Sequence, residues 1–284
     1  MYQGLIRQGA EVLQQNERAG VEYLTFPLLT ETKLVRHLFS TRIGGVSEGI
    51  WRSMNLSFTR GDNERSVEEN FRRIAHVLSG EPGDMVASDQ THTANIRRIT
   101  AGDRGKGVIR PKDYQDVDGM ITDVPGIILT TFYADCVPLY FVDSKKRAIG
   151  LSHAGWKGTV GSIGPRTIAA MTEAFGSDPA DVYAAIGPSI CQDCYEVGVD
   201  VAEPFAALFS SAGQADAVIK PGRRPDKYQL DLQEANRLLL LAAGVHADHI
   251  AVTDLCTCCN PDYLFSHRAS EGKRGNMAAL LSLI

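Results

Sequence analysis

Apolar and polar positions are arranged in blocks along the middle of the chain, where the longest mostly apolar run covers residues 127–142. A short polar turn follows, and a second apolar run covers 147–153. This pattern predicts two strands joined by a hairpin or a bend. Asp135 and Cys136 interrupt the first run and His153 ends the second. Neighbouring strands could therefore bring Cys136 and His153 together across the 17 positions (153 − 136) that separate them.

The rest of the sequence mixes helical and extended patterns. Apolar residues at helical spacing predict helices over about 64–78, 162–175, 199–212 and 230–243. Asn63 or Ser66 is expected to cap the first of these, and Gly244 to end the last. Short apolar runs predict strands over 85–90, 182–186, 250–254, 264–268 and 277–284. No repeat, low-complexity tract or linker separates these elements, which favours one mixed α/β domain over residues 1–284.

Composition narrows the class of protein. The 284 residues carry 29 Lys and Arg against 34 Asp and Glu, so no basic field indicates nucleic acid or an anionic membrane as a partner. Six cysteines in a chain of this length do not indicate a disulfide scaffold. The first residues contain no apolar signal core, and Asp135 and Pro138 break the longest apolar run. We expect a soluble, cytoplasmic protein, either a monomer or a homodimer.

A thiol beside an imidazole supports two kinds of chemistry. In one, His153 lowers the pKa of the Cys136 thiol, which then acts as a nucleophile. In the other, both side chains are ligands of a metal, most plausibly Zn²⁺, and a third ligand would complete a catalytic site with one open position. A purely structural buried cysteine near a hydrogen-bonded histidine is the third interpretation. His92, at the end of a predicted strand, matters only if it meets this pair.

Two other features are weaker signals. Arg42 precedes a Gly44-Gly45 loop, whose backbone amides could hold a phosphate or carboxylate beside the guanidinium, although such loops are common on surfaces. The pattern C-x-x-C at Cys191 and Cys194, followed by Cys256, Cys258 and Cys259, is similar to a zinc ribbon. Cys194 and Cys256 are 62 positions apart (256 − 194), beyond the usual ribbon spacing, which favours free thiols lining or underlying a pocket.

Ordered motifs along the chain match one protein family. They lie at 39–47 (FSTRIGGVS), 55–56, 61–62, 70, 90–92, 118, 134–138 (ADCVP), 153–158 (HAGWKG), 186–188 and 194–197. The sequence resembles the bacterial polyphenol oxidoreductase or laccase-domain family, whose members were later described as purine nucleoside phosphorylases. The similarity runs from about residue 37 to the C-terminus, and the combination of ADCVP with HAGWKG is specific.

The resemblance implies a Zn²⁺ held by His92, Cys136 and His153, with Arg42 and Gln90 nearby. It implies phosphorolysis of adenosine, inosine, guanosine and methylthioadenosine, together with adenosine deamination. The implied fold is a layered mixed-sheet structure (α/β/β/α-like), related to the cytotoxic necrotising factor deamidases. One departure concerns the family's closing arginine, because Asn276 stands at its expected position. Arg274 or Arg268 would then have to replace it.

Candidate roles follow for the remaining polar residues. Cys136, His153 and Asp135 are the candidate catalytic residues, with Asp135 or Glu196 carrying a proton during deamination. Arg42 and Lys157 are candidates for binding phosphate. Candidates for hydrogen bonds to ribose or base are Asn55, Asp62 and Asp118, for which a capping or turn role is the alternative.

Other functions remain open at this point. A Cys136–His153 hydrolase or amidase would agree with descriptions of related proteins as editing factors for muramyl precursors of the cell wall. A copper polyphenol oxidase needs many histidine ligands, and the chain has seven histidines, several in ordinary helix or turn contexts. Copper is therefore less favoured than zinc. A non-enzymatic binding module is the last alternative, because fold resemblance alone does not establish turnover.

Overall fold

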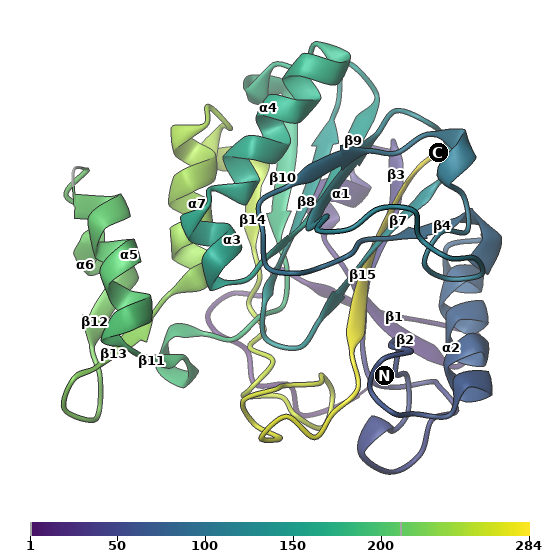
Figure 1. The fold of residues 1–284 in the computed structure, drawn as a ribbon, viewed down its shortest axis with the longest axis horizontal. Coiled ribbons are helices and arrows are strands. Elements are labelled where there is room, and N and C mark those ends of the chain that lie inside the picture. The colour runs from purple at the N-terminus through teal and green to yellow at the C-terminus, as the bar shows by residue number, and fades with distance from the viewer. Residues whose placement is uncertain (1, 211) are drawn as a thin grey trace.

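Residues 2–210 and 212–284, which the computed structural model describes, form two six-stranded sheets and a small three-stranded sheet (Figure 1). The two large sheets are stacked face to face, and helices cover the outer face of each. This arrangement confirms the layered α/β fold expected from the sequence. No helix within these residues is both long and apolar enough to cross a membrane.

The first sheet joins the two ends of the chain. Its strand order is β1 (Gln14–Arg18), β2 (Val21–Thr25), β3 (Val35–Ser40), β15 (Met277–Leu283), β7 (Ile128–Tyr133) and β4 (Met85–Ala87). Neighbouring strands are antiparallel except β4, which runs parallel to β7.

The second sheet comes from the middle of the chain. Its strand order is β14 (Ile250–Val252), β10 (Val182–Ile186), β8 (Val137–Asp143), β9 (Ala148–Ala154), β6 (Gly119–Thr122) and β5 (Ile96–Arg98). The small sheet contains β11 (Glu196–Gly198), β13 (Lys227–Leu230) and β12 (Ile219–Pro221). The helices are α1 (Pro27–Thr30), α2 (Glu64–Val77), α3 (Trp156–Val160), α4 (Ile163–Phe175), α5 (Val199–Ser210), α6 (Ala215–Val218) and α7 (Leu232–Ala242).

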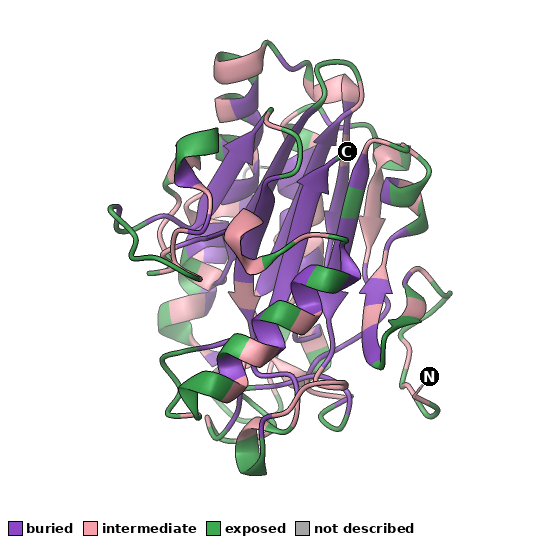
Figure 2. Ribbon diagram, turned by 90° about the vertical axis from the view of Figure 1, so that its right-hand side faces the viewer, coloured by how far each residue is buried: buried purple, intermediate pink, exposed green. Residues whose placement is uncertain are grey.

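Strands buried on both faces explain the long apolar runs in the sequence. In β8, Tyr140 and Val142 pack into the core between the two sheets, whereas Leu139 and Phe141 pack into the core beneath the helices. Figure 2 shows the strands as a buried layer behind the partly exposed helix α2. The sheets therefore form a rigid support on which the connecting loops are held.

Capping groups begin the helices where the sequence predicts. The Asn63 side chain accepts a hydrogen bond from the N–H of Ser66 at the start of α2. Asp231 accepts from the N–H of Glu234 at the start of α7, and Gly244 follows the end of that helix with a positive φ of 96°. The predicted cap at Asn63 and the predicted helix end at Gly244 are confirmed, whereas the cap at Asp231 was not predicted.

Two strand predictions are wrong. The run 127–142 is not one strand, because Asp135 adopts a left-handed φ of 91° that breaks it. β7 belongs to the first sheet and β8 to the second, so residues 134–136 cross from one sheet to the other. The predicted strand at 264–268 is irregular, and the N–H of Arg268 donates to the Asp135 carboxylate instead of to a strand partner.

Candidate functional site

Three side chains from distant parts of the sequence meet near this crossover. His92 lies in the loop after β4, Cys136 ends the crossover, and His153 lies near the end of β9. Pairing of β8 with β9 places Pro138 opposite His153, which brings Cys136 close to the histidine. One ligand atom from each of the three side chains lies within 4.8 Å of the other two. Such a set of two imidazoles and one thiolate is suited to Zn²⁺.

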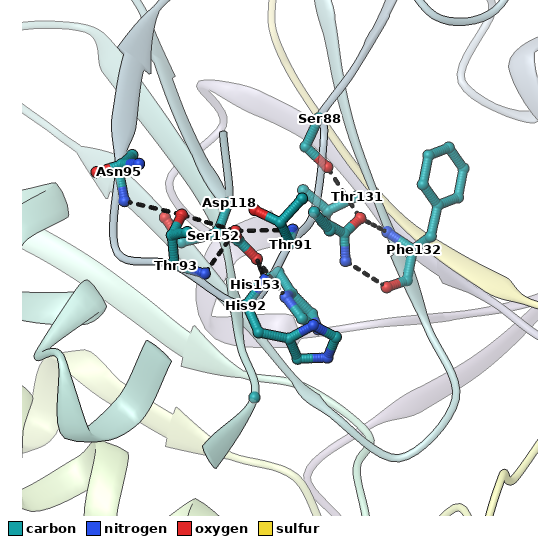
Figure 3. A network of polar contacts seen from close by, with 12 residues as sticks. Ser88, Thr91, His92, Thr93, Asn95, Asp118, Thr131, Phe132, Ser152 and His153 are labelled. Atoms are coloured by element: carbon teal, nitrogen blue, oxygen red, sulfur yellow. Dashed lines mark hydrogen bonds and ion pairs between the residues drawn. The ribbon is translucent and has the colours of Figure 1, made fainter. Parts of the chain in front are cut away.

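Asp118 orients the His153 ring and holds the backbone that carries His92. Its carboxylate, fully buried, accepts a hydrogen bond of 2.8 Å from His153 Nδ1 (Figure 3). It also accepts from the backbone N–H groups of Thr91, His92 and Thr93, at 3.1, 3.2 and 2.8 Å. Because Nδ1 of His153 is engaged, Nε2 is the nitrogen left to bind a metal, as in many metal sites where a carboxylate supports a histidine ligand.

Cys136 and His153 have strongly shifted pKa values. Burial opposes ionisation of Cys136, but His153, followed by His92, outweighs burial and lowers the pKa of the thiol from 9.0 to about 6. Burial also favours the neutral form of His153, but the Cys136 thiolate and the Asp118 carboxylate raise its pKa from 6.5 to about 9. Near neutral pH the two side chains therefore form a thiolate–imidazolium pair whenever no metal competes for them.

Alkylation should reveal this pair in metal-free protein. Because only the thiolate reacts, carboxymethylation of Cys136 is expected to reach half its maximal rate near pH 6 and to fall below that pH. The His153→Gln variant should shift the midpoint upward, toward or beyond 9.0. Mass spectrometry of the Cys136 peptide at a series of pH values measures both midpoints. A midpoint near 9.0 in the wild-type protein would contradict the pairing.

The three side chains border a cavity of about 460 Å³, within the range of small-molecule sites. Phe58 and Phe132 supply aromatic surface, and Gln90 and Asn276 supply amides. The Gln90 amide is itself paired with the backbone of Phe132, through two hydrogen bonds of 2.7 Å. Gln90 therefore lines the cavity and also holds the end of β7 in place.

Cationic side chains line the same cavity, and the sequence analysis did not predict most of them. They are Arg60, Lys112 and Arg274, of which only Arg274 was considered as a substitute for a family arginine. Arg274 is 8% exposed, and its Nε has no hydrogen-bond partner within residues 2–210 and 212–284. Burial, followed by the nearby Arg60, lowers the pKa of Arg274 to about 10, so it stays charged. A buried guanidinium with a free donor is suited to an anion.

Arg42 and Lys157 lie apart from this cavity. Arg42 donates to the carbonyls of Arg52 and Pro261, and its guanidinium lies 4.5 Å from the centre of the Phe265 ring. Lys157 is exposed on α3 beside the Trp156 ring. Among the described residues, the cavity lining includes neither of them. These two candidate cations therefore lie outside the described lining of the cavity, since Arg42 is held by backbone carbonyls and Lys157 lies exposed on a helix.

Several polar side chains that were expected to contact substrate are instead directed into the protein. Asn55 is fully buried; it donates to Asp62 and accepts from the N–H of Asn276. The Asp135 carboxylate accepts from Thr257 Oγ1 at 2.7 Å and from the N–H of Arg268. In the described part of the chain, Asn55, Asp118 and Asp135 are absent from the cavity lining. Their side chains fix the loops around the site, and only the tertiary contacts reveal this.

The fold and site together define a layered α/β protein with a three-ligand His/Cys/His centre beside a cation-lined cavity. The family model described as "Multi-copper polyphenol oxidoreductase laccase" matches residues 36–284. The chain belongs to this family, as its motifs indicated.

Relatives with assigned activities are similar over most of their length. The purine nucleoside phosphorylase YlmD of Bacillus subtilis is 38% identical over 249 residues, which cover 86% of this chain and 87% of that protein. An adenosine deaminase designated RL5, from an unknown prokaryotic organism, is 34% identical over 81% of this chain and 87% of its own length. The crystal structure of YlmD from Geobacillus stearothermophilus matches with a TM-score of 0.85 and 34% identity, over 96% of this chain and 99% of that chain. The chain is thus a member of a family of enzymes.

Gly155 leaves the space that the three ligands occupy. A Cβ atom at this position would lie 2.8 Å from Cδ2 of His92 and 3.3 Å from Sγ of Cys136. Its φ of −71° suits any residue, so Gly155→Ala should fold but displace the ligands. We expect metal affinity and turnover to fall roughly a hundredfold, measured by metal titration and rate assays. Gly102→Ala is the control, because its Cβ would meet nothing closer than 3.7 Å. Unchanged metal affinity in Gly155→Ala would show that the ligands do not converge as described.

Proposed function

We propose that this protein is a zinc-dependent purine nucleoside phosphorylase that also deaminates adenosine. The observation that carries the proposal is the convergence of His92, Cys136 and His153 beside a cavity of about 460 Å³ that is lined by cations. The names of the relatives in Bacillus subtilis and of the RL5 deaminase support both activities. Adenosine, inosine, guanosine and methylthioadenosine are the proposed nucleosides, with phosphate as the second substrate.

The donor set favours one zinc ion over several coppers. A thiolate and two imidazoles are ordinary zinc ligands, and the Asp118 carboxylate accepts a hydrogen bond from Nδ1 of His153, which holds the ring in position to bind a metal through Nε2. Within residues 2–210 and 212–284, this is the one candidate cluster that contains histidine, so the described chain offers no multi-copper arrangement. Zinc bound there would keep an open position, polarise substrate groups and lower the pKa of water.

Arg60, Lys112 and Arg274 are proposed to bind phosphate. Each carries a positive charge at the cavity wall, and Arg274 offers a buried donor without a partner in the described chain. The aromatic rings of Phe58 and Phe132 offer a surface for the purine base. This arrangement would hold phosphate and nucleoside in one cavity, which phosphorolysis requires.

The proton carrier is assigned to Asp89. Asp89 is half-buried and lines the cavity, where its carboxylate pairs with Lys112 and accepts from the N–H of Asp116. The carboxylates suggested by sequence, Asp135 and Glu196, are absent from the described cavity lining. Asp135 accepts from Thr257 and Arg268, and Glu196 from Arg223 and Arg224. Asp118 is assigned to orienting His153 rather than to contact with substrate, since its oxygens accept five protein hydrogen bonds.

A hydrolase or amidase acting through Cys136 and His153 is the second candidate. The observation that favours it is the Cys136–His153–Asp118 series, in which Asp118 bonds Nδ1 of the histidine and the pKa of the thiol falls to about 6. This is the arrangement of a cysteine nucleophile with its base and orienting carboxylate. Amide bonds in muramyl precursors of the cell wall are the substrates to test for this candidate.

One experiment separates the two candidates. Protein of known metal content is incubated with adenosine, with and without phosphate, and adenine, inosine, hypoxanthine and ribose 1-phosphate are resolved by chromatography. We expect ribose 1-phosphate to form only when phosphate is present, and inosine to form whether or not phosphate is present. Both activities should be lost after chelation and should return when zinc is added. Amidase activity that survives chelation but not thiol alkylation would favour the second candidate. Absence of turnover of all four nucleosides by zinc-loaded protein would refute the first.

A further inference from the structure

Four of the six cysteines form a second cluster away from the cavity. Cys191 and Cys194 lie in the segment that follows β10, and Cys256 and Cys259 in the segment that follows β14. One sulfur from each lies within 4.8 Å of the other three. The long separation in sequence, which argued against a shared zinc, is therefore bridged by the fold.

Strand pairing explains why the two segments meet. β10 and β14 are parallel neighbours, with Ile186 opposite Val252, so the chain leaves both strands at the same edge of the sheet. The segments continue side by side, because Ser189 pairs with Cys256 and the N–H of Thr257 donates to the Ser189 carbonyl at 3.1 Å. Each C-x-x-C turn then directs its two sulfurs toward the other turn.

The spacing of the sulfurs suits a tetrahedral metal site. A Zn–S bond of about 2.3 Å places the sulfurs of an ideal tetrathiolate about 3.8 Å apart. Here Sγ of Cys194 and Sγ of Cys259 are 3.5 Å apart, and the set spans no more than 4.8 Å. All six cysteines are free in the described chain. The sulfurs thus lie at distances typical of ligands that share one ion.

Backbone donors surround the sulfurs. The N–H of Cys191 donates to Sγ of Cys256 at 3.2 Å. The N–H groups of Cys194 and Cys259 face the sulfurs of Cys191 and Cys256 in the same way. N–H groups directed at sulfur stabilise the thiolate form that a metal requires. Cys191 and Cys256 are buried, and Cys194 and Cys259 are half-buried, so the site is enclosed on one side and reachable from the other.

We propose that Cys191, Cys194, Cys256 and Cys259 bind a structural Zn²⁺ ion. Four protein ligands leave no open position, so this ion cross-links the two segments and takes no part in turnover. The link extends toward the active site, because Thr257 Oγ1 donates to the Asp135 carboxylate and the N–H of Ile190 donates to the Asp135 carbonyl. Asp135 directly precedes Cys136, so the cluster holds the crossover that carries the thiol ligand.

Metal content tests the proposal independently of catalysis. A protein with both sites filled should bind about two zinc ions per chain. The Cys191→Ser/Cys256→Ser variant should bind about one, and Cys258→Ser, the matched control from the same turn, should still bind about two. Loss of zinc in Cys258→Ser with retention in Cys259→Ser would overturn the proposed ligand set.

A variant without the histidine-containing site gives a second readout that does not require the cysteine variants to fold. His92→Ala/Cys136→Ser should retain about one zinc, with X-ray absorption showing four sulfur neighbours at about 2.3 Å. Zinc bound there through nitrogen or oxygen, iron in place of zinc, or no metal in protein prepared under reducing conditions would each overturn the proposal. So would a native mass showing disulfides between these cysteines in freshly purified protein.

Discussion

We expect Cys136→Ser to lose the proposed catalytic zinc and both proposed nucleoside activities. The thiolate is one of three candidate ligands, and a neutral hydroxyl is a poor replacement in a site whose other donors are imidazoles. We expect turnover to fall about a thousandfold or more, equivalent to about 4 kcal/mol of transition-state stabilisation. Metal analysis and chromatography of the adenosine products measure the two losses on the same preparation.

His92→Ala distinguishes the roles that Cys136 could have. His92 is exposed, so its removal should not disturb the fold, yet it should abolish zinc binding at this site and turnover with it. A cysteine nucleophile paired with His153 would keep its activity in this variant, since Asp118 and His153 remain. Cys258→Ser serves as the control for thiol loss in general. Turnover of adenosine at the wild-type rate in Cys136→Ser would show that the reaction takes place at another site.

Arg274→Gln is expected to separate phosphorolysis from deamination. The variant removes a buried charge whose Nε has no partner in the described chain, and which we assign to phosphate. Loss of a charge-assisted hydrogen bond of about 1.5–3 kcal/mol should raise the KM for phosphate roughly ten- to hundredfold. Deamination uses no phosphate, so its rate should remain within about threefold of the wild-type value.

Two comparisons make the Arg274 result specific. Arg274→Lys keeps the charge and should recover part of the phosphate affinity, although a single ammonium cannot reproduce the planar guanidinium. Lys157→Gln should leave the KM for phosphate unchanged, because Lys157 is exposed and lies outside the described lining of the cavity. Equal loss of both activities in Arg274→Gln, with the same metal content, would contradict the phosphate assignment.

The proximity of Cys136 and His153 was predictable because it depends only on the pairing of two strands that are consecutive in the sequence. β8 and β9 are joined by a short turn, so their pairing brings Cys136 close to His153, as the two apolar runs indicated. The role of His92 as a metal ligand was predicted from the family motifs and not from any local pattern, because nothing in residues 90–92 indicates which strand this loop will lie beside. The cations could not be found in this way, because Arg60 and Arg274 lie in polar loops that look like ordinary surface.

Local patterns in the sequence were enough to place the four long helices and several of the buried strands. The cap at Asn63, the glycine after α7 and the apolar run of β10 act within a few residues, so they can be recognised without the fold. The tertiary structure alone decided which sheet each strand joins. The left-handed Asp135 sends β7 and β8 to different sheets, and the parallel pairing of β10 with β14 brings the four cysteines together. Strand partners are chosen by burial of side chains across the whole core, and no short segment carries that information.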